Sequence, residues 1–242
     1  MDITKLELRY VKTSGESLRM GASTTLTELA NSSDLNRPSL QAIGDALRET
    51  RPIQVRNAAT VAGCICSGLP FFDLPVALLA LNASVRVYGR NGYRKIPLER
   101  FFLGYFSVDL KRGEFVTEVD VPVHNAKTAS AFQKFSITGD DWAIVNVAVF
   151  LSISSNNKCK RVRIAVGGAV GATPVRATRA ESVVLGKTLS AEMLRKASEE
   201  AASEIQPDTD IRASAEYRRK LCTVLVERSL KQALSRSSRK NN

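Results

Sequence analysis

The sequence predicts an α+β fold. In the C-terminal half, segments with strand character come first and segments with helix character come last, which is the order found in α+β proteins. Two apolar stretches, AIVNVAVFLSIS and KRVRIAVGGA, flank the turn residues SNNK and are typical of strands. The stretches SAEMLRKASEEAASEI and SAEYRRKLCTVLVERSLKQAL follow, with apolar residues at helical spacing. We therefore expect a small antiparallel sheet plus helices in this half.

The N-terminal half mixes short strands with short helices. Residues 17–22 (SLRMGA) predict a strand, and the Ser/Thr-rich stretch STTLTELANSSDL predicts the start of a helix. In SLQAIGDALRET, Ile43 and Leu47 lie on one helical face. SVRVYGRNGYRKIPL predicts a hairpin that turns at Asn91-Gly92, and EFVTEVDVP alternates as a strand that ends at Pro122.

The stretch HNAKTASA, which begins at His124, predicts a linker between two units. The first unit is expected over residues 1–126 and the second over residues 127–235, with a basic tail over residues 236–242. The change from strand periodicity to helix periodicity after the linker favours this division.

Composition bounds the class of protein. The chain has 242 residues, 44% of them hydrophobic and 24% charged, which is typical of a globular protein. No apolar run approaches the length of a membrane span, and MDITKLELRY lacks the apolar region of a secretory signal, so we expect a cytoplasmic protein. The net charge of +11 indicates an acidic protein partner or plain solubility; nucleic acid is unlikely because aromatic residues do not alternate with the basic ones.

Metal chemistry and catalysis by side chains have little support in the sequence. The chain has four cysteines and one histidine, and C-x-C at Cys64 and Cys66 is neither a redox motif nor a usual zinc site. His124 lies in the predicted linker, which favours an ordinary surface histidine. We therefore expect no metal ligands and no catalytic residues.

Small residues dominate the stretch ATVAG, from Ala59 to Gly63, which predicts a loop that lets a ligand approach the backbone. Asp73 precedes the apolar run LPVALLAL and has the place of a helix N-cap, with Pro75 in the first turn. The alternative interpretation is structural, with Asp73 as a cap only and the small residues as a tight turn. Neither a Walker motif nor GxGxxG is present in this stretch.

The segment VRNAATVAGCI followed by DLPVALLAL resembles the signature of the FAD-binding (medium) subunits of molybdenum hydroxylases, the family of the xanthine dehydrogenase and carbon monoxide dehydrogenase flavoproteins. Further segments resemble the family in the same order: LRMGASTTLTELA, IPLERFFLGY, GEFVTEVDVP, FQKFSITGDDWAIVNVAV, IAVGGAVGATPVRATRAE and DIRASAEYRRKL. The resemblance implies the second subdomain of a PCMH-type FAD-binding domain, followed by a carbon monoxide dehydrogenase flavoprotein C-terminal-like domain.

The resemblance also implies a function. In this family the substrate is hydroxylated at a molybdopterin cofactor on a large partner subunit, electrons pass through iron–sulfur clusters on a small partner subunit, and FAD on the medium subunit delivers them to an acceptor. By residue-to-residue carry-over, the positions that contact FAD are Ala59, Thr60, Gly63, Ile65, Cys66 and Asp73, and Lys134 lies near the flavin. A cation at Lys134 would stabilise negative charge on a reduced flavin; the alternative is a solvated strand lysine.

Two departures from the family pattern stand out. Ala62 and Cys64 replace a Gly and an Asn of the signature, which makes the site more apolar. In addition, Met1 lies close to the strand that follows the family's first FAD subdomain, whose Gly-Gly loop grips the pyrophosphate. We therefore expect that another chain supplies that subdomain, that the reading frame is truncated, or that the chain does not bind FAD alone.

Three functions stay open on the sequence. The first is an electron-transfer flavoprotein subunit, which makes the chain an oxidoreductase subunit active only in a complex. The second is a non-flavin docking subunit of such a complex. The third, which depends only on net charge, is a basic nucleic-acid-binding module.

Overall fold

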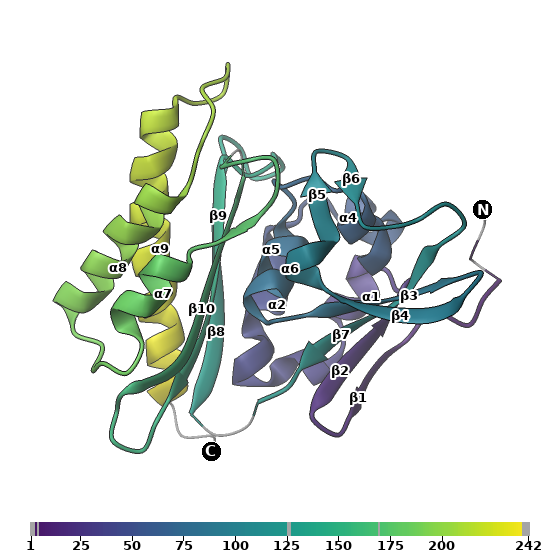
Figure 1. The fold of residues 1–242 in the computed structure, drawn as a ribbon, viewed down its shortest axis with the longest axis horizontal. Coiled ribbons are helices and arrows are strands. Elements are labelled where there is room, and N and C mark those ends of the chain that lie inside the picture. Colours follow the sequence, from purple (N-terminus) through teal and green to yellow (C-terminus); the bar gives the residue numbers. More distant parts are fainter. Residues whose placement is uncertain (1–2, 4, 125–126, 169, 239–242) are drawn as a thin grey trace.

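The first half of the chain folds round a five-stranded antiparallel sheet. The computed structural model describes residues 3, 5–124, 127–168 and 170–238. Within them the strands follow the order β1-β2-β7-β3-β4 (Figure 1). Their bounds are β1 Val11–Ser14, β2 Ser17–Gly21, β3 Ser84–Gly89, β4 Gly92–Pro97 and β7 Phe115–Pro122. A two-stranded ribbon of β5 (Phe102–Gly104) and β6 (Ser107–Val108) stands beside it.

Short helices fill the space between this sheet and the rest of the molecule. They are α1 Leu26–Ala30, α2 Gln41–Glu49, α3 Ile53–Ala58, α4 Val61–Cys66, α5 Asp73–Ala80 and α6 Leu98–Phe101, with two 3-10 turns at Ser33–Asn36 and Pro38–Leu40. Thr25 and Glu28 form a capping box that starts α1. Every residue of α5 is buried, because its sequence DLPVALLA offers apolar side chains on all faces.

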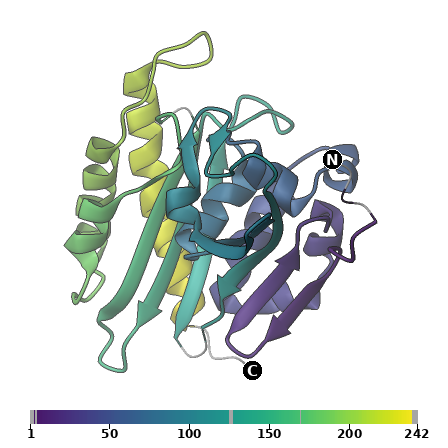
Figure 2. The same ribbon diagram turned by 45° about the vertical axis from the view of Figure 1, so that its right-hand side comes forward.

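The second half contains a four-stranded antiparallel sheet with the order β11-β10-β9-β8. The strands are β8 Thr128–Phe135, β9 Val145–Ile153, β10 Cys159–Gly168 and β11 Val175–Arg176. Helices α2 and α5 pack against one face of this sheet, and α7 (Thr178–Val184) and α9 (Ala215–Ser238) pack against the other (Figures 1 and 2). Helix α8 (Ala191–Glu204) lies outside, against α7 and α9.

Burial on both faces explains the nearly continuous apolar sequence of β9. Val145, Val147 and Val149 belong to the core under α7 and α9, whereas Ala148 and Phe150 belong to the core shared with the first half. Asn146 therefore points toward α5 as well, and it is fully buried. No helix among the described residues combines the length and apolar character needed to cross a bilayer.

Several expected boundaries are wrong in detail. The β3–β4 hairpin forms, but Gly89 pairs with Gly92, so Arg90 and Asn91 make the turn and Gly92, at φ 89°, follows it. The predicted linker overlaps β8, which begins at Thr128. Its small residues join the sheet next to β9, and α2 packs against them. Residues 236–238 of the predicted tail belong to α9, and residues 239–242 lie outside the described residues.

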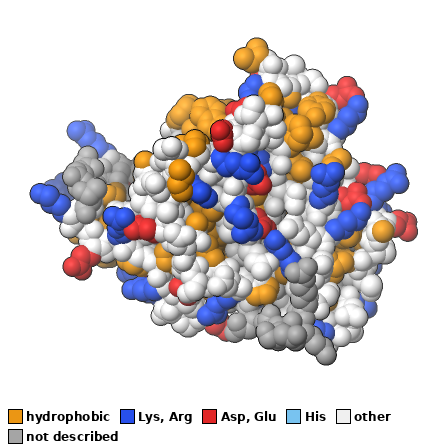
Figure 3. All heavy atoms as spheres, turned by 180° about the vertical axis from the view of Figure 1, so that it is seen from behind, with side chains coloured by type: hydrophobic (Ala, Val, Ile, Leu, Met, Phe, Trp, Pro, Cys, Tyr) orange, Lys and Arg blue, Asp and Glu red, His pale blue; other side chains and the backbone are white. Residues whose placement is uncertain are grey.

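The division at residue 126 stays a prediction, since the second sheet takes one of its two helical layers from the first half. Basic side chains gather across the middle of the rear face of the molecule, with apolar side chains along its upper rim (Figure 3). The net charge of +11 is therefore not confined to the tail.

Candidate functional site

A buried polar cluster joins the two halves of the chain at the start of α5. Lys134 on β8 and Asn146 on β9 are directly opposite each other in the ladder, so both side chains reach the same place. Lys134 Nζ lies 2.9 Å from Asp73 Oδ2, and Asn146 Nδ2 donates to Asp73 Oδ1 at 2.7 Å. Lys134 Nζ also reaches the carbonyl oxygen of Glu49 at the end of α2, at 3.4 Å. Two strands and two helices therefore position this cluster.

The cluster is nearly closed to water. The side chains of Lys134 and Asp73 are each 5% exposed, so the alternative of a solvated strand lysine is wrong. Burial raises the pKa of the Asp73 carboxyl, whereas the ammonium of Lys134 and the amide of Asn146 lower it. Asp73 also lies in the first turn of α5, where the helix dipole favours a negative charge. Asn146 Oδ1 is buried without a hydrogen-bond partner among the described residues.

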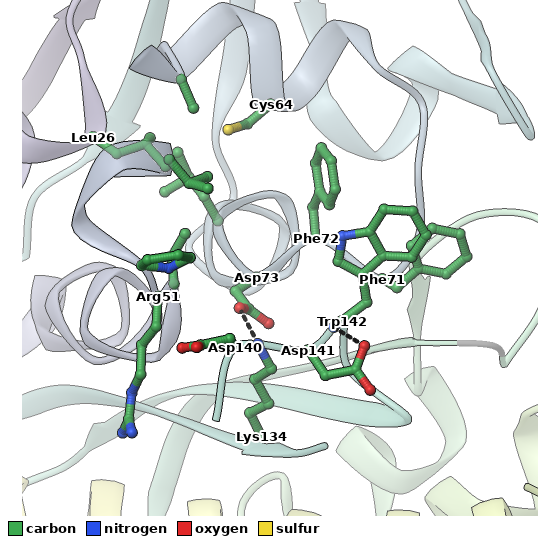
Figure 4. A pocket seen from close by; sticks show the side chains of 15 residues that line it. Leu26, Arg51, Cys64, Phe71, Phe72, Asp73, Lys134, Asp140, Asp141 and Trp142 are labelled. Atoms are coloured by element: carbon green, nitrogen blue, oxygen red, sulfur yellow. Dashed lines mark hydrogen bonds and ion pairs between the residues drawn. The ribbon is translucent and has the colours of Figure 1, made fainter. Parts of the chain in front are cut away.

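A cavity of about 160 Å³ opens beside Asp73 and Lys134 (Figure 4). In Figure 4, Lys134 rises from β8 toward Asp73, while Cys64 and Leu26 lie on the opposite side of the cavity. Most of its wall is apolar: Leu26, Pro52, Val55, Ala59, Cys64, Phe71, Phe72, Leu74 and Trp142. Burial raises the pKa of the Cys64 thiol to about 12, so this thiol is uncharged at neutral pH and belongs to the apolar wall.

Aromatic rings form one side of the cavity. Trp142 stacks on Phe71 with ring centroids 5.1 Å apart and meets Phe72 edge-on at 6.4 Å. Asp141 and Arg212 fix the backbone of Trp142: Asp141 Oδ1 accepts from its N–H at 2.8 Å, and Arg212 donates to its carbonyl at 2.7 Å. An ion pair of 2.9 Å joins Asp141 to Arg212. Trp142 itself remains 55% exposed, so part of its ring is open to a ligand.

The expected loop over Ala59–Gly63 is largely helical. Ala59 is the C-cap of α3, Thr60 is the N-cap of α4, and Gly63 lies inside α4. Thr60 Oγ1 accepts from the N–H of Gly63 at 3.1 Å, and the N–H groups of Val61 and Ala62 donate to the carbonyls of Thr24 and Ala22. The first-turn amides of α4 therefore have partners inside the protein. Ala62 replaces glycine without strain, since its φ is not positive.

The predicted N-cap at Asp73 is also wrong. Phe72 occupies the N-cap position of α5, and Asp73 is the first helical residue. Its carboxylate turns to Lys134 and Asn146 because a buried charge needs charged or strongly donating partners more than a helix start needs a cap.

The cavity brings together three of the seven predicted site residues, namely Ala59, Asp73 and Lys134. Of the others, Ile65 is fully buried in the core and Cys66 is half-buried against it, whereas Gly63 is exposed. The cofactor role of all seven stays a prediction. Sequence reasoning missed Asn146 and Trp142, although a lone Asn in the apolar run AIVNVAVF signals a buried polar contact. No group of three His, Cys, Asp or Glu suited to a metal occurs within the described ranges.

Two family models cover nearly the whole chain. Residues 1–124 match the FAD binding domain in molybdopterin dehydrogenase, and residues 130–233 match the CO dehydrogenase flavoprotein C-terminal domain. The cavity lies where these two regions meet, since α5 belongs to the first and Lys134 to the second.

Curated relatives and solved structures agree with these matches. The chain is 33% identical over 233 residues to the glyceraldehyde dehydrogenase medium chain of Sulfolobus acidocaldarius, covering 96% of this chain and 82% of that protein. It is 34% identical over 225 residues to the nicotine 6-hydroxylase medium subunit of Paenarthrobacter nicotinovorans, covering 92% and 77%. The solved carbon monoxide dehydrogenase of Hydrogenophaga pseudoflava, which lacks the Mo-pyranopterin moiety of its cofactor, superposes with a TM-score of 0.90 at 32% identity, covering 95% of this chain and 79% of that one.

The resemblance drawn from the sequence is thereby confirmed, and so is the mixed helix-and-sheet fold that it implies. The chain belongs to the FAD-binding medium subunits of the molybdenum hydroxylases, the oxidoreductase family of carbon monoxide dehydrogenase and xanthine dehydrogenase.

Proposed function

We propose that this chain is the electron-transfer subunit of a cytoplasmic molybdenum hydroxylase complex. In this proposal it receives electrons from iron–sulfur clusters on a small partner subunit and passes them to an acceptor, while a large partner subunit holds the molybdopterin cofactor. The observation that carries the proposal is the cavity beside Asp73 and Lys134, which combines a flat aromatic wall with one buried ammonium. FAD, when bound, supplies the redox chemistry of such a subunit.

The residues of the cavity fit a flat heteroaromatic ring. Phe71, Phe72 and Trp142 offer ring faces and edges for stacking, and the aliphatic wall opposite excludes water. Lys134 supplies a positive charge in a site of low dielectric constant, where it favours extra negative charge on a neighbouring group. Asp73 pairs with that ammonium, and Asn146 donates to Asp73 and fixes its carboxylate, so the ammonium needs no reorganisation when charge arrives.

The same residues do not offer enough free hydrogen-bond donors and cations to bind a pyrophosphate. The amides at the start of α4 are already bonded within the chain, and Lys134 is the only Lys or Arg other than Arg51 that lines the described part of the cavity. We therefore propose that the chain alone holds the ring part of the cofactor, and that a further segment or another chain supplies the phosphate contacts. The non-flavin docking subunit is less well supported because it gives no reason for an aromatic cavity beside a buried ammonium.

The single tryptophan of the chain gives a direct test, because Trp142 lines the cavity. Flavins absorb where tryptophan emits, so a flavin bound there quenches Trp142 fluorescence in a saturable way. We expect riboflavin and FAD to bind the purified chain weakly and with affinities within about tenfold of each other, that is, within about 1.4 kcal/mol, because only the ring is held. N-acetyltryptophanamide, titrated in parallel, corrects for absorption by the free flavin.

Replacement of Phe71 by Ala removes the ring that stacks on Trp142 and should weaken both flavins equally. Replacement of the exposed Tyr93, far from the cavity in the β3–β4 hairpin, is the matched aromatic control. Absence of saturable quenching by either flavin, together with absence of flavin from the purified complex, would refute the proposed function. Binding of FAD more than a hundredfold tighter than riboflavin would instead show that the chain carries its own phosphate site.

A further inference from the structure

Two adjoining hollows lie along β9 and β10. One of them lies at the end of the second sheet where the β9–β10 hairpin turns, and Figure 1 shows this turn at the bottom. One, of about 730 Å³, runs over the hairpin turn. The other, of about 400 Å³, lies between β9, β10 and the C-terminal end of α5. They share Lys160 and Arg161 and therefore form one continuous surface, called here the basic groove.

The basic groove is lined by cations and hydroxyls. Its basic residues are Lys127, Lys158, Lys160, Arg161, Arg163 and Arg176. Neither hollow has an Asp or Glu among its described lining residues. Arg163 and Arg176 pair with Glu99 at 3.3 and 3.0 Å. The other four basic residues have no carboxylate within 4.0 Å among the residues that the structure describes, so their charge is not neutralised locally.

A β-bulge creates the most basic point of the groove. The register of β10 against β9 shifts between Cys159 and Arg161. Cys159 and Val162 are buried, whereas Lys160 and Arg161 between them are both exposed. A regular strand would turn one of these two neighbours inward, so the bulge is what presents two successive cations to solvent. Bulges of this kind commonly re-aim side chains at binding sites.

The aromatic residues of the groove argue against stacking of nucleic acid bases. Phe150 is 4% exposed, and the guanidinium of Arg161 already lies over its ring at 5.8 Å. His124 lies 5.2 Å from the same ring, and burial together with the charge of Arg161 lowers the pKa of its imidazole. No Tyr or Trp lines the described part of the groove. Sequence-tolerant binding of single strands needs open aromatic faces, which this surface lacks.

We propose that the basic groove binds an acidic polypeptide segment of a partner protein. Side-chain carboxylates of that segment pair with Lys158, Lys160 and Arg161, and the hydroxyl of Ser155 in the hairpin offers a further hydrogen bond. The proposal goes beyond flavin chemistry and does not depend on it, since the groove is lined by none of the residues that line the cavity beside Asp73.

The test is a calorimetric titration of the full chain with a short polyglutamate peptide, at low and at physiological ionic strength. A short oligothymidylate and inorganic phosphate are titrated in the same way. The groove variant is Lys160→Gln with Arg161→Gln, and Lys127→Gln with Lys158→Gln is the second variant. The control is Arg90→Gln with Lys196→Gln, which removes the same charge from exposed residues of the β3–β4 turn and α8.

We expect one peptide per chain, affinity that falls with salt, and a loss of about tenfold or more in each groove variant against about twofold or less in the control. Equal weakening by the control variant would overturn the proposal, because it would show attraction to net charge alone. Absence of saturable binding would overturn it as well. If oligothymidylate binds more tightly than the peptide and the same variants lose that binding, the proposal is overturned, because the ligand of the groove is then a nucleic acid. If phosphate displaces the peptide at equal concentration, the proposal is also overturned, because the groove is then a site for small anions.

Discussion

Removal of Asp45 or Arg236 tests what holds the two halves of the chain together. Asp45 on α2 is 6% exposed and accepts from the backbone N–H of Phe132 on β8 at 3.2 Å. Two guanidinium nitrogens of Arg236, near the end of α9, donate to the two oxygens of the same carboxylate at 2.5 and 3.0 Å. Arg236 also donates to the carbonyl oxygen of Ser130 at 2.8 Å. The outer edge of β8 therefore bonds to side chains where another strand would otherwise pair.

The magnitude follows from burial. The side chain of Arg236 is 16% exposed and that of Asp45 is 8% exposed, so Arg236→Met leaves a nearly buried carboxylate with Arg48 as its remaining charged partner. Breaking a buried ion pair from one side costs about 3–5 kcal/mol. We expect Asp45→Ala to reach this range, because it also frees the N–H of Phe132, and Arg236→Met to cost somewhat less. A loss of this size lowers the Tm by about 6–20 °C in a chain of this length.

The assay is urea unfolding of the full chain, followed by circular dichroism, for both single variants and the double variant. Arg228→Met, an exposed arginine of the same helix without an ion pair in the described structure, is the matched control and should stay within about 0.5 kcal/mol of wild type. A coupling energy of about 1–3 kcal/mol is expected between Asp45 and Arg236. Strictly additive losses, or an Arg236 variant no less stable than the Arg228 control, would refute the reasoning.

Three further predictions concern single positions. A Cβ at Gly167 would collide with Asn146 Oδ1 and would lie 2.7 Å from the carbonyl oxygen of Pro70, so Gly167→Ala should destabilise by about 1–3 kcal/mol in the same urea unfolding assay. In contrast, Gly44→Ala, whose nearest atom lies 3.6 Å away inside α2, should stabilise by about 0.5–1 kcal/mol. Burial raises the pKa of Cys64 and Cys222 to about 12, so iodoacetamide at pH 8 should alkylate them at least a hundredfold more slowly than free cysteine; rapid labelling in the folded chain would contradict the buried geometry. Burial and the hydrogen bond to Glu118 raise the pKa of Tyr10 from 10.0 to about 12, so its stabilising effect should be present below pH 10 and lost as the pH rises toward 12; Tyr10→Phe should remove that pH dependence, and an unchanged dependence would assign it elsewhere.

Much of the fold can be predicted from local patterns. The helices α2, α8 and α9 have apolar residues at helical spacing, and β7, β9 and β10 carry strand patterns bounded by turn residues. These elements depend on neighbours in sequence, so periodicity is enough to find them. The short helices α3 and α4 lack this signal, because α3 buries none of its residues and α4 has only six.

The candidate site is only partly predictable, because its contacts are long-range. Lys134 and Asn146 are separated from Asp73 by 61 and 73 residues, and no local pattern indicates that the three side chains meet. The resemblance to the family identified Asp73 and Lys134 but not their mutual ion pair. Sequence position predicts a helix cap at Asp73, and the resemblance implies an FAD contact there, but neither expectation includes the ion pair with Lys134.

The buried ion pairs Asp45–Arg236 and Asp73–Lys134 differ in what they do. Asp45 and Arg236 share their hydrogen bonds with the backbone edge of β8, which needs partners whether or not a ligand is present. Asp73 and Lys134 face a cavity, and Lys134 Nζ makes only a long backbone contact among the described residues, at 3.4 Å to the carbonyl oxygen of Glu49. Apolar residues of equal volume often replace a buried ion pair with no loss of stability, so stability alone is a poor reason for a charged pair in a cavity wall. We propose that the charge on Lys134 meets the charge of a ligand, and that the paired carboxylate of Asp73 offsets the cost of burying this ammonium. The Asp45–Arg236 pair therefore holds the two halves of the chain together, and we assign the Asp73–Lys134 pair to the proposed flavin site.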